Sequence, residues 1–419
     1  MPLSESFKER LFPILPGLSD HFETPFHIYD ELGIKQTGAH LNSVFSGIES
    51  FREYYAVKAL PNPAILKIIK ELGFGYDCSS ITELILNRQA GATGADLMFT
   101  SNNTNEEEFK IADADGGCIL NLDDISLIDK VVKMPETICF RYNPGAERDG
   151  NSIIGNLLES KYGVSRDQIV GAYRKARSRG ASRFGLHTML ASNELDYKYM
   201  VMTAQMLLDL AEQIQKELNI TFDFINIGGG LGIPYLPGDA PLDIEAMGEE
   251  ITESFQTFKA RNDYMPALFL ESGRYITGPH GALALTAINR KDIYRTYIGV
   301  DGCMSSLMRP ALYGAYHHID VLGKNGSESL ETVDVVGSLC ENNDKFAIQR
   351  HLPPIADGDL LIIHDTGAHG HAMGFNYNGK LRPKELLLRE DGSVELIRRA
   401  ETNDDYFATL NFSQDIFRS

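Results

Sequence analysis

Lys58 lies at the end of a short apolar run, in Tyr54-Tyr-Ala-Val-Lys-Ala-Leu-Pro-Asn-Pro63. Residues 54–57 are typical of a buried β-strand, and a helix is expected to begin near Pro63. A lysine at the end of a buried strand is costly to desolvate, and its amine can form a Schiff base with a carbonyl cofactor. The alternative is an ordinary solvated lysine at the end of a strand.

A carboxylate and a guanidinium follow a second apolar run, in Glu271-Ser-Gly-Arg274. The two side chains could form a local ion pair. They could instead face one ligand, because a carboxylate beside a pyridine nitrogen keeps that nitrogen protonated and makes the ring an electron sink. The arginine would then suit a phosphate or a carboxylate.

Two further candidate pairs lie late in the chain. Arg309 precedes Tyr313 by four residues, which suits either a carboxylate clamp or an arginine that stabilises a loop. Cys340 and Glu341 are adjacent. The thiol could donate a proton and the carboxylate could hold an ammonium group, although core packing is the alternative for a lone cysteine.

The run Gly228-Gly-Gly-Leu-Gly232 could wrap a phosphate with its backbone N–H groups, or it could be a plain strand-to-helix turn. It lacks the GxGxxG spacing of a dinucleotide-binding loop. The histidines of His364-Asp365 and His369-Gly-His371 lack the spacing of a metal motif. We therefore expect no metal site.

The elements that must position these residues follow an alternating pattern before residue 280. Amphipathic stretches such as 62–72, 81–91, 105–113, 123–132 and 194–218 separate short apolar runs. Alternating strands and helices predict parallel strands, and eight of them predict an α/β fold built on a (β/α)8 TIM-like barrel, with a doubly wound open sheet as the alternative. The eight expected strands are 54–57, 75–78, 96–100, 117–121, 137–142, 182–187, 222–227 and 268–271.

After residue 280 the pattern indicates a C-terminal β-rich domain. We expect a barrel over residues 35–280 and a β-sandwich or Greek-key-like domain over 281–419, joined by an N-terminal strand at Thr24–Tyr29 within residues 1–34. In such a barrel, chemistry gathers at the carboxyl ends of the strands, where Asp77, Arg141 and His187 also lie. The expected strands of the β-rich domain are 282–289, 295–300, 317–321, 333–336, 359–364 and 395–399.

The composition argues against several classes of partner. The 419 residues carry a formal net charge of −19, which disfavours nucleic acid and anionic membranes. The N-terminus has no signal-peptide core, and no apolar run is long enough to span a membrane. The five cysteines are scattered, which predicts neither a disulfide scaffold nor a zinc ribbon. These features predict a cytoplasmic enzyme.

Taken together, the motifs resemble the alanine-racemase-like, fold type III pyridoxal-phosphate enzymes, and most closely the diaminopimelate decarboxylases, with ornithine and arginine decarboxylases as relatives. The resemblance runs from about Pro25 to Arg399. In chain order, the motifs that carry it are YAVKA around Lys58, Asp77-Cys-Ser-Ser-Ile-Thr-Glu83, Arg141-Tyr-Asn-Pro144, Lys161-Tyr-Gly163, Gly228-Gly-Gly230, Glu271-Ser-Gly-Arg274, Met308-Arg-Pro-Ala-Leu-Tyr313, Cys340-Glu341, Asp365-Thr-Gly-Ala-His369 and Asn376-Tyr-Asn378.

The resemblance implies a role for each candidate residue. Lys58 would hold pyridoxal 5'-phosphate, Glu271 would face its pyridine nitrogen, and Asp77 would belong to the same cofactor site. Cys340 would protonate the carbanion after CO2 leaves. The residues implied around the phosphate are Ser192, Gly229, Gly230, Arg274 and Tyr377. Those implied around the substrate are Arg309, Tyr313, Glu341, Arg274 and Tyr377. In this family the Cys-Glu segment comes from the partner subunit, so the resemblance also implies a homodimer with shared active sites.

The expected reaction is decarboxylation of meso-2,6-diaminopimelate to L-lysine and CO2. One departure bears on it: the usual H-x-H-I-G-S is here His187-Thr-Met-Leu-Ala-Ser192, so Met189 replaces the histidine expected to stack on the cofactor ring. Ser272 and His369 replace the usual proline and tyrosine. The alternatives are decarboxylation of ornithine, lysine, arginine or a carboxylated polyamine, or a weakly active cofactor-binding homologue.

Overall fold

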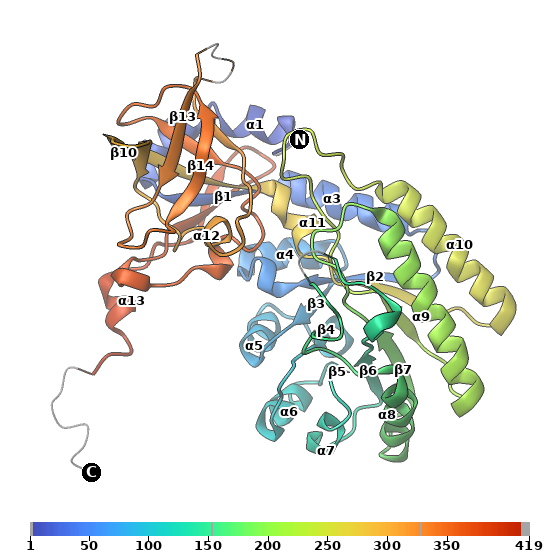
Figure 1. Cartoon of the computed structure of the whole chain (residues 1–419). Helices are drawn as coiled ribbons and strands as arrows, with labels where there is room; N and C mark the ends of the chain where they lie inside the picture. The colour runs from blue at the N-terminus through green and yellow to red at the C-terminus, as the bar shows by residue number, and fades with distance from the viewer. Residues whose placement is uncertain (1–2, 152–153, 325, 327–328, 412–419) are drawn as a thin grey trace. The chain divides into compact units, whose positions relative to one another are not determined.

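The computed structural model describes residues 3–151, 154–324, 326 and 329–411. The chain forms two compact units (Figure 1). The first, called here the barrel unit, comprises Gly33–Pro234 and Gly238–Gly278. The second, called the β unit, comprises the described residues up to Leu32, then Tyr235–Pro237, and those from Pro279 onwards.

Eight parallel strands close into a barrel, so the predicted (β/α)8 fold is confirmed and the open-sheet alternative is wrong. Each predicted run overlaps one strand, with ends that differ by at most a few residues. The strands are β2 (Phe51–Ala56), β3 (Gly75–Cys78), β4 (Leu97–Phe99), β5 (Ile119–Leu122), β6 (Thr137–Arg141), β7 (Arg183–His187), β8 (Phe224–Asn226) and β9 (Ala267–Leu270).

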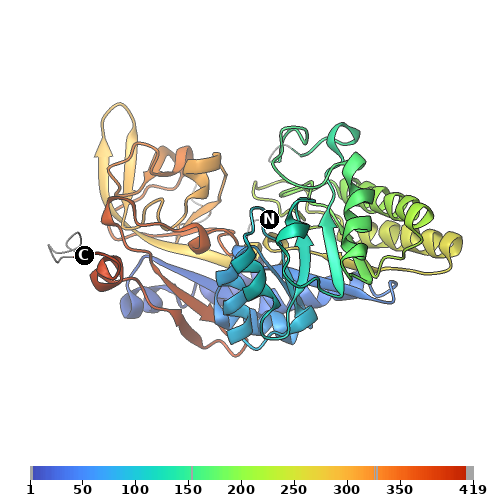
Figure 2. The ribbon, with the colours of Figure 1, turned by 90° about the horizontal axis from the view of Figure 1, so that it is seen from below.

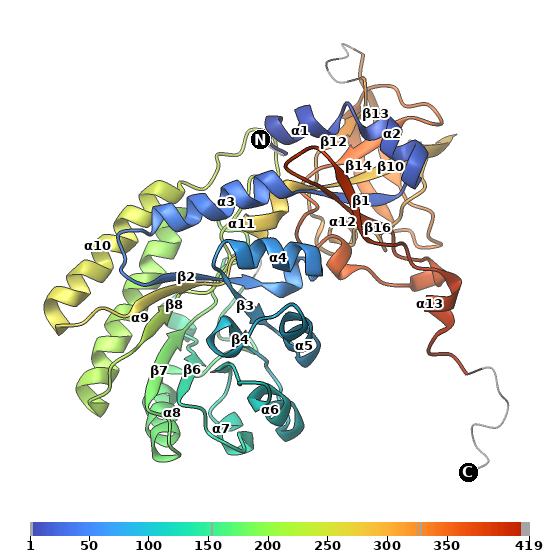
Figure 3. The same cartoon turned by 180° about the vertical axis from the view of Figure 1, so that it is seen from behind.

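Helices follow the strands and lie outside the barrel (Figures 1 and 3). Local sequence sets their ends: α4 begins at Pro63 because the Asn62 side chain caps the N–H of Ala64 at 3.0 Å. The helices are α3 (Glu31–Val44), α4 (Pro63–Glu71), α5 (Ile81–Gln89), α6 (Glu106–Asp113), α7 (Leu127–Lys130), α8 (Arg166–Ser178), α9 (Tyr197–Leu218), α10 (Ile244–Asn262) and α11 (Arg274–Thr277).

An apolar layer fills the barrel interior towards the amino-terminal ends of the strands. It consists of Tyr54, Met98, Ile119, Cys139 and Phe224, with Ala267 and Phe269 packed against it. Two glycines make room for the large rings, since a Cβ on Gly75 would lie 2.6 Å from the Tyr54 ring and one on Gly185 would lie 2.0 Å from the Phe224 ring. Side chains alternate along a strand. The residue two positions after each member of this layer therefore also faces the barrel interior, nearer the carboxyl end of its strand.

The β unit is built on one nine-stranded sheet in the order β14-β13-β11-β10-β1-β16-β17, with β15 on β10 and β12 on β15. The hairpin between β10 and β11 is visible in Figure 2. The strands are β1 (Phe26–Asp30), β10 (Gly281–Asp292), β11 (Thr296–Val300), β12 (Ile319–Val321), β13 (Glu331–Val336), β14 (Lys345–Leu352), β15 (Leu360–Ile363), β16 (Lys384–Leu388) and β17 (Val394–Arg398). Short helices complete the unit: α1 (Glu5–Leu11), α2 (Leu15–Phe22), α12 (Arg309–Tyr313) and α13 (Asn403–Phe407).

Two strands of this sheet were not predicted from the sequence. In β14, the polar run Gln349-Arg-His351 breaks the alternation of apolar and polar residues that marks a strand. The strand is also irregular at this point, because Gln349 has a φ of 48° and the pairing of β14 with β13 shifts register. β16 reads Lys-Glu-Leu-Leu-Leu, and its acidic residue Glu385 is buried against Tyr29 and Arg398. Among the described residues, no helix combines the length and apolar character needed to cross a bilayer.

Candidate active site

Polar side chains replace the apolar layer at the carboxyl ends of the barrel strands. All of them are buried, and they come from seven different strands or from the residue that directly follows a strand. Such a ring is where barrel enzymes place their chemistry. Its members are Asp77, Thr100, Asn121, Arg141, His187, Asn226 and Glu271.

Lys58 lies beside this ring, in a single 3₁₀ turn, Val57–Ala59, that follows β2. Its Nζ is 3.7 Å from Asp77 Oδ2, and its side chain is half-exposed while Asp77 is buried. Burial, reinforced by the charge of Glu271, raises the pKa of Asp77 to about 7, although Lys58 opposes the shift. The other oxygen, Asp77 Oδ1, is buried and meets no hydrogen-bond donor among the described residues.

Glu271 is held by one donor on each oxygen. His187 Nε2 donates to Oε2 at 3.2 Å, and Asn226 Nδ2 donates to Oε1 at 2.8 Å. Asn121 Nδ2 donates in turn to His187 Nδ1 at 2.9 Å, which fixes the imidazole ring. Burial alone would raise the pKa of Glu271, but His187, followed by Lys58 and Arg141, lowers it to about 2. The carboxylate is therefore ionised at neutral pH.

Arg141 is paired rather than directed at solvent. Its Nε lies 2.9 Å from Asp123 Oδ1, and Asn102 donates to the other oxygen of Asp123 at 2.9 Å. The guanidinium carbon also lies 4.9 Å from the ring centre of Tyr162. The structure therefore places the two motifs Arg141-Tyr-Asn-Pro144 and Lys161-Tyr-Gly163 side by side.

The glycine run that follows β8 is packed too closely for any larger residue. A Cβ on Gly228, Gly229 or Gly230 would lie 2.2–2.5 Å from a backbone oxygen of a neighbouring segment. The thioether of Met189 lies against this run, and Gly229 N donates to Met189 Sδ at 3.2 Å. Ser192 belongs to the adjoining segment, where its carbonyl accepts from Asn151 Nδ2 at 2.7 Å. Arg274 begins the short helix α11.

In the β unit, α12 begins with Arg309 and ends with Tyr313, but the two side chains differ in environment. Arg309 is buried, donates to His317 Nε2 at 2.8 Å and lies 4.5 Å from the ring centre of Tyr235. Tyr313 is 62% exposed. The structure thus places the two predicted clamp residues in different environments, one buried and one exposed.

Cys340 and Glu341 lie in a turn that contacts the segment containing Tyr377. The backbone N–H of Cys340 donates to Asn378 Oδ1 at 2.7 Å, and Glu341 Oε1 accepts from the N–H of Asn343 at 3.1 Å. Cys340 and Tyr377 are both exposed. The structure therefore brings the adjacent residues Cys340 and Glu341 to the segment of Tyr377, which lies more than 30 positions further along the sequence.

Sequence reasoning missed Thr100, Asn121, Asn226 and Asp123. Asn121 and Asn226 face the barrel interior two positions beyond the apolar residues Ile119 and Phe224. That spacing was visible in the sequence, and a buried polar residue at the end of an apolar strand is the signal that could have found them.

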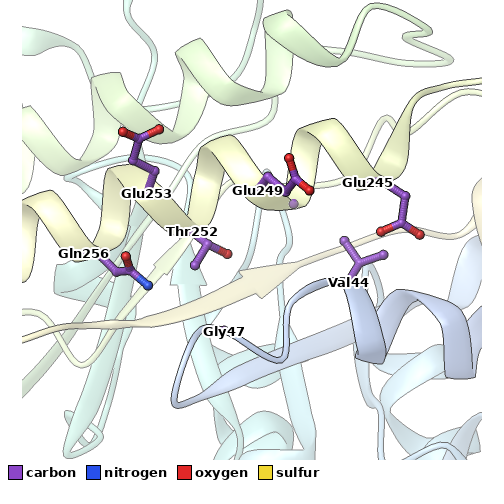
Figure 4. Close-up of a pocket in the computed structure, with 8 residues that line it drawn as sticks. Val44, Gly47, Glu245, Glu249, Thr252, Glu253 and Gln256 are labelled. Atoms are coloured by element: carbon purple, nitrogen blue, oxygen red, sulfur yellow. The ribbon is translucent and has the colours of Figure 1, made fainter.

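A groove of about 340 Å³ lies on the outside of the barrel, between α10 and the connection from α3 to β2 (Figure 4). None of the predicted site residues lines it. Its lining carries three carboxylates but no histidine, thiol or lysine. The lining residues are Val44, Gly47, Glu245, Gly248, Glu249, Thr252, Glu253 and Gln256.

Comparison with known proteins gives the chain close relatives over its whole length. It is 46% identical to Protein TabA of Pseudomonas amygdali pv. tabaci over 418 residues, which covers 100% of the chain and 98% of the relative. It is 37% identical to the diaminopimelate decarboxylase of Methanothermobacter thermautotrophicus over 402 residues, or 94% of the chain and 93% of the relative. The crystal structure of diaminopimelate decarboxylase from M. jannaschii in complex with L-lysine matches with a TM-score of 0.86 and 28% identity, covering 95% and 94% of the two chains.

The family described as "Pyridoxal-dependent decarboxylase, pyridoxal binding domain" matches residues 34–278, more than half of the chain. This match spans the barrel and every ring residue of the candidate site. The chain therefore belongs to the pyridoxal-dependent decarboxylases, which are carbon–carbon lyases that act with pyridoxal phosphate.

Proposed function

We propose that this protein decarboxylates meso-2,6-diaminopimelate to L-lysine and CO2, with catalysis at the ring of polar residues in the barrel. The observation that carries the proposal is the buried Glu271, held by His187 and Asn226 in the same strand-end ring that Lys58 adjoins. Similarity to diaminopimelate decarboxylases, one of them in complex with L-lysine, supports the choice of substrate.

The residues of the barrel site fit pyridoxal phosphate. Lys58 offers a half-exposed amine for its carbonyl, and Glu271 offers an ionised carboxylate for its ring nitrogen. The glycine run follows the carboxyl end of β8, and glycine backbone N–H groups at such a turn can hold a phosphate. Asp77 adds a buried oxygen that still lacks a donor among the described residues.

Each residue would then contribute one physical task. When bound, pyridoxal phosphate supplies the electron sink for the electron pair released by the breaking Cα–carboxylate bond. Lys58 would hold the cofactor and release it to the substrate amine. Glu271 would keep a proton on the ring nitrogen. The proposed phosphate-binding residues are Ser192, Gly229, Gly230, Arg274 and Tyr377.

The remaining steps fall to residues of the β unit. Arg309, Tyr313 and Glu341 would bind the distal, amino-acid end of the substrate, and Cys340 would deliver a proton to the substrate carbon after CO2 leaves. Charged groups at both ends of diaminopimelate need partners of opposite charge, which an arginine and a glutamate supply.

We also propose a homodimer in which the Cys340–Glu341 turn completes the site of the partner subunit. Tyr313, Cys340 and Tyr377 support it, because reactive and aromatic side chains so exposed on a single chain are available to a second one. A cytoplasmic location accords with five cysteines that are all free.

Met189 favours a second candidate, the decarboxylation of a different amino acid. Its sulfur lies against Gly229, at the position where the resemblance leads one to expect a histidine on the cofactor ring. A thioether packs on an aromatic ring but supplies no imidazole hydrogen bond or charge. The relative with 46% identity carries the name TabA rather than that of a decarboxylase.

One experiment separates the two candidates. Purified protein loaded with pyridoxal phosphate is incubated with meso-diaminopimelate, lysine, ornithine and arginine, and CO2 and the amine or amino-acid products are measured. The proposal predicts CO2 and L-lysine from diaminopimelate at the highest rate. Faster release of CO2 from another amino acid would select the second candidate.

A further inference from the structure

Glu53 is a fully buried carboxyl group that none of the steps above uses. It lies on β2, five residues before Lys58, and pairs with Leu270 in the ladder between β2 and β9. Its neighbour Tyr54 packs in the apolar layer inside the barrel. Because side chains alternate along a strand, Glu53 faces the opposite side of the barrel wall.

The carboxyl group of Glu53 binds the turn that carries Glu271. The backbone N–H of Ser272 donates to Glu53 Oε1, while Oε2 is buried without a donor among the described residues. Burial, with the nearby Glu271, raises the pKa of Glu53 well above its ordinary value, although the Ser272 N–H opposes the shift. A buried carboxyl is expensive to desolvate, so its presence here calls for a compensating contact or task.

The same turn also packs against the residues that flank Lys58. A Cβ on Gly273 would lie 2.6 Å from Ala59 Cβ and 3.2 Å from Ala56 Cβ, so the turn touches both sides of the lysine segment. A second contact joins the two segments in α11, where Tyr55 Oη lies 3.2 Å from Thr277 Oγ1. Glu53 therefore anchors the turn at the point where β2, which leads to Lys58, lies beside β9, which leads to Glu271.

We propose that Glu53 is a positioning residue, which through the Ser272 N–H fixes the spacing between Lys58 and Glu271 and so the fit of the cofactor ring between them. The inference rests on the roles proposed for Lys58 and Glu271. It also assigns a reason to Ser272. A proline at this position, the residue usual in the family pattern, would have no N–H to give to Glu53.

The test measures binding of pyridoxal 5'-phosphate to the apoprotein by equilibrium dialysis, in three single variants and one double variant. Glu53→Leu keeps the volume but leaves the Ser272 N–H without an acceptor, and we expect about tenfold weaker binding. Glu53→Gln keeps the acceptor, and we expect binding within about threefold of wild type. Ser272→Pro removes the donor and should weaken binding about tenfold.

The double variant Glu53→Leu/Ser272→Pro has neither the donor nor the acceptor. Removing both members of a buried pair costs less than orphaning one, so its affinity should exceed that of either single variant. The matched control is Asp334→Leu, which removes a buried carboxyl that accepts a backbone N–H, that of Gln349 at 2.7 Å, in the β unit. It should lower the melting temperature and leave cofactor affinity within about twofold.

Three results would overturn the proposal: wild-type affinity in Glu53→Leu, equal loss in Glu53→Gln and Glu53→Leu, or losses that simply multiply in the double variant. If Glu53→Leu does not fold, the contrast between Glu53→Gln and Ser272→Pro decides, since only the second should lose affinity. Failure of the proposed function is separate. Wild-type protein that binds the cofactor yet releases no CO2 from diaminopimelate would refute the substrate and leave the Glu53 cycle intact.

Discussion

His187 Nε2 donates to Glu271 Oε2 at 3.2 Å, and this contact joins β7 to the end of β9 inside the barrel. It helps to hold the pKa of the buried Glu271 below its ordinary value. His187→Gln should raise the pKa of Glu271 and reduce kcat/KM by about tenfold to a hundredfold, because a hydrogen bond to a charged group contributes about 1.5–3 kcal/mol. Steady-state rates over a pH series check this, since a higher Glu271 pKa moves the acid limb of the profile to higher pH.

His364→Gln is the matched control. His364 is also fully buried, and its Nε2 lies 3.0 Å from Asp320 Oδ2, but both residues belong to the β unit outside the ring. This variant should lose stability and keep the acid limb in place. An equal shift of the limb in both variants would contradict the role given to His187.

Asp77 gives the apoprotein a defined pH dependence. Its pKa is raised from 3.8 to about 7 in the folded state, so the folded state binds a proton that the unfolded state has released. The stabilisation is complete below about pH 4, and the free energy of unfolding then falls by up to about 1.4 kcal/mol per pH unit until about pH 7. Asp77→Asn removes the titration, so its stability should be flatter over this window. Urea denaturation at a series of pH values gives the free energy of unfolding of both proteins. If this free energy depends on pH in the same way in both, Asp77 does not titrate in this window.

The barrel could be predicted because each of its strands is a short apolar run followed by an amphipathic stretch. β14 and β16 could not, because a left-handed Gln349 and a buried Glu385 break the alternation that marks a strand. The ends of the barrel strands identified Lys58, Asp77 and Glu271 as candidates.

The contacts among site residues were beyond the sequence. Asn121 and Asn226 carry no motif, and only the closed barrel brings them to His187 and Glu271. The burial of Arg309 against Tyr235 was equally hidden, since that contact joins positions more than 70 residues apart.

Substrate preference should depend on Tyr313 and Arg309 in different ways. Tyr313 is exposed, so Tyr313→Phe should weaken the preference for diaminopimelate over lysine and leave the melting temperature unchanged. Arg309→Ala should reduce the preference by about tenfold or more. It should also lower stability, because it removes the buried hydrogen bond from Arg309 to His317. Competition assays with paired substrates and thermal unfolding measure both effects. Equal or better activity of the unmutated protein on lysine or ornithine would contradict the clamp.

Shared active sites predict complementation between two inactive variants. Lys58→Ala and Cys340→Ala should recover activity when mixed and allowed to exchange subunits, because a mixed dimer has one site with both lesions and one with neither. Random pairing makes half of the dimers mixed, so activity should reach about one quarter of wild type. Subunit exchange demonstrated by native mass spectrometry without any recovered activity would rule out shared sites.

Lys58 is the residue on which the whole site depends, and its role can be measured directly. Protein loaded with pyridoxal phosphate is reduced with borohydride, digested, and mapped by peptide mass spectrometry. The cofactor should be fixed to the peptide that contains Lys58, and Lys58→Ala should carry no label and release no CO2. A cofactor label on another lysine of the wild-type protein would contradict the placement of the active site at the carboxyl ends of the barrel strands.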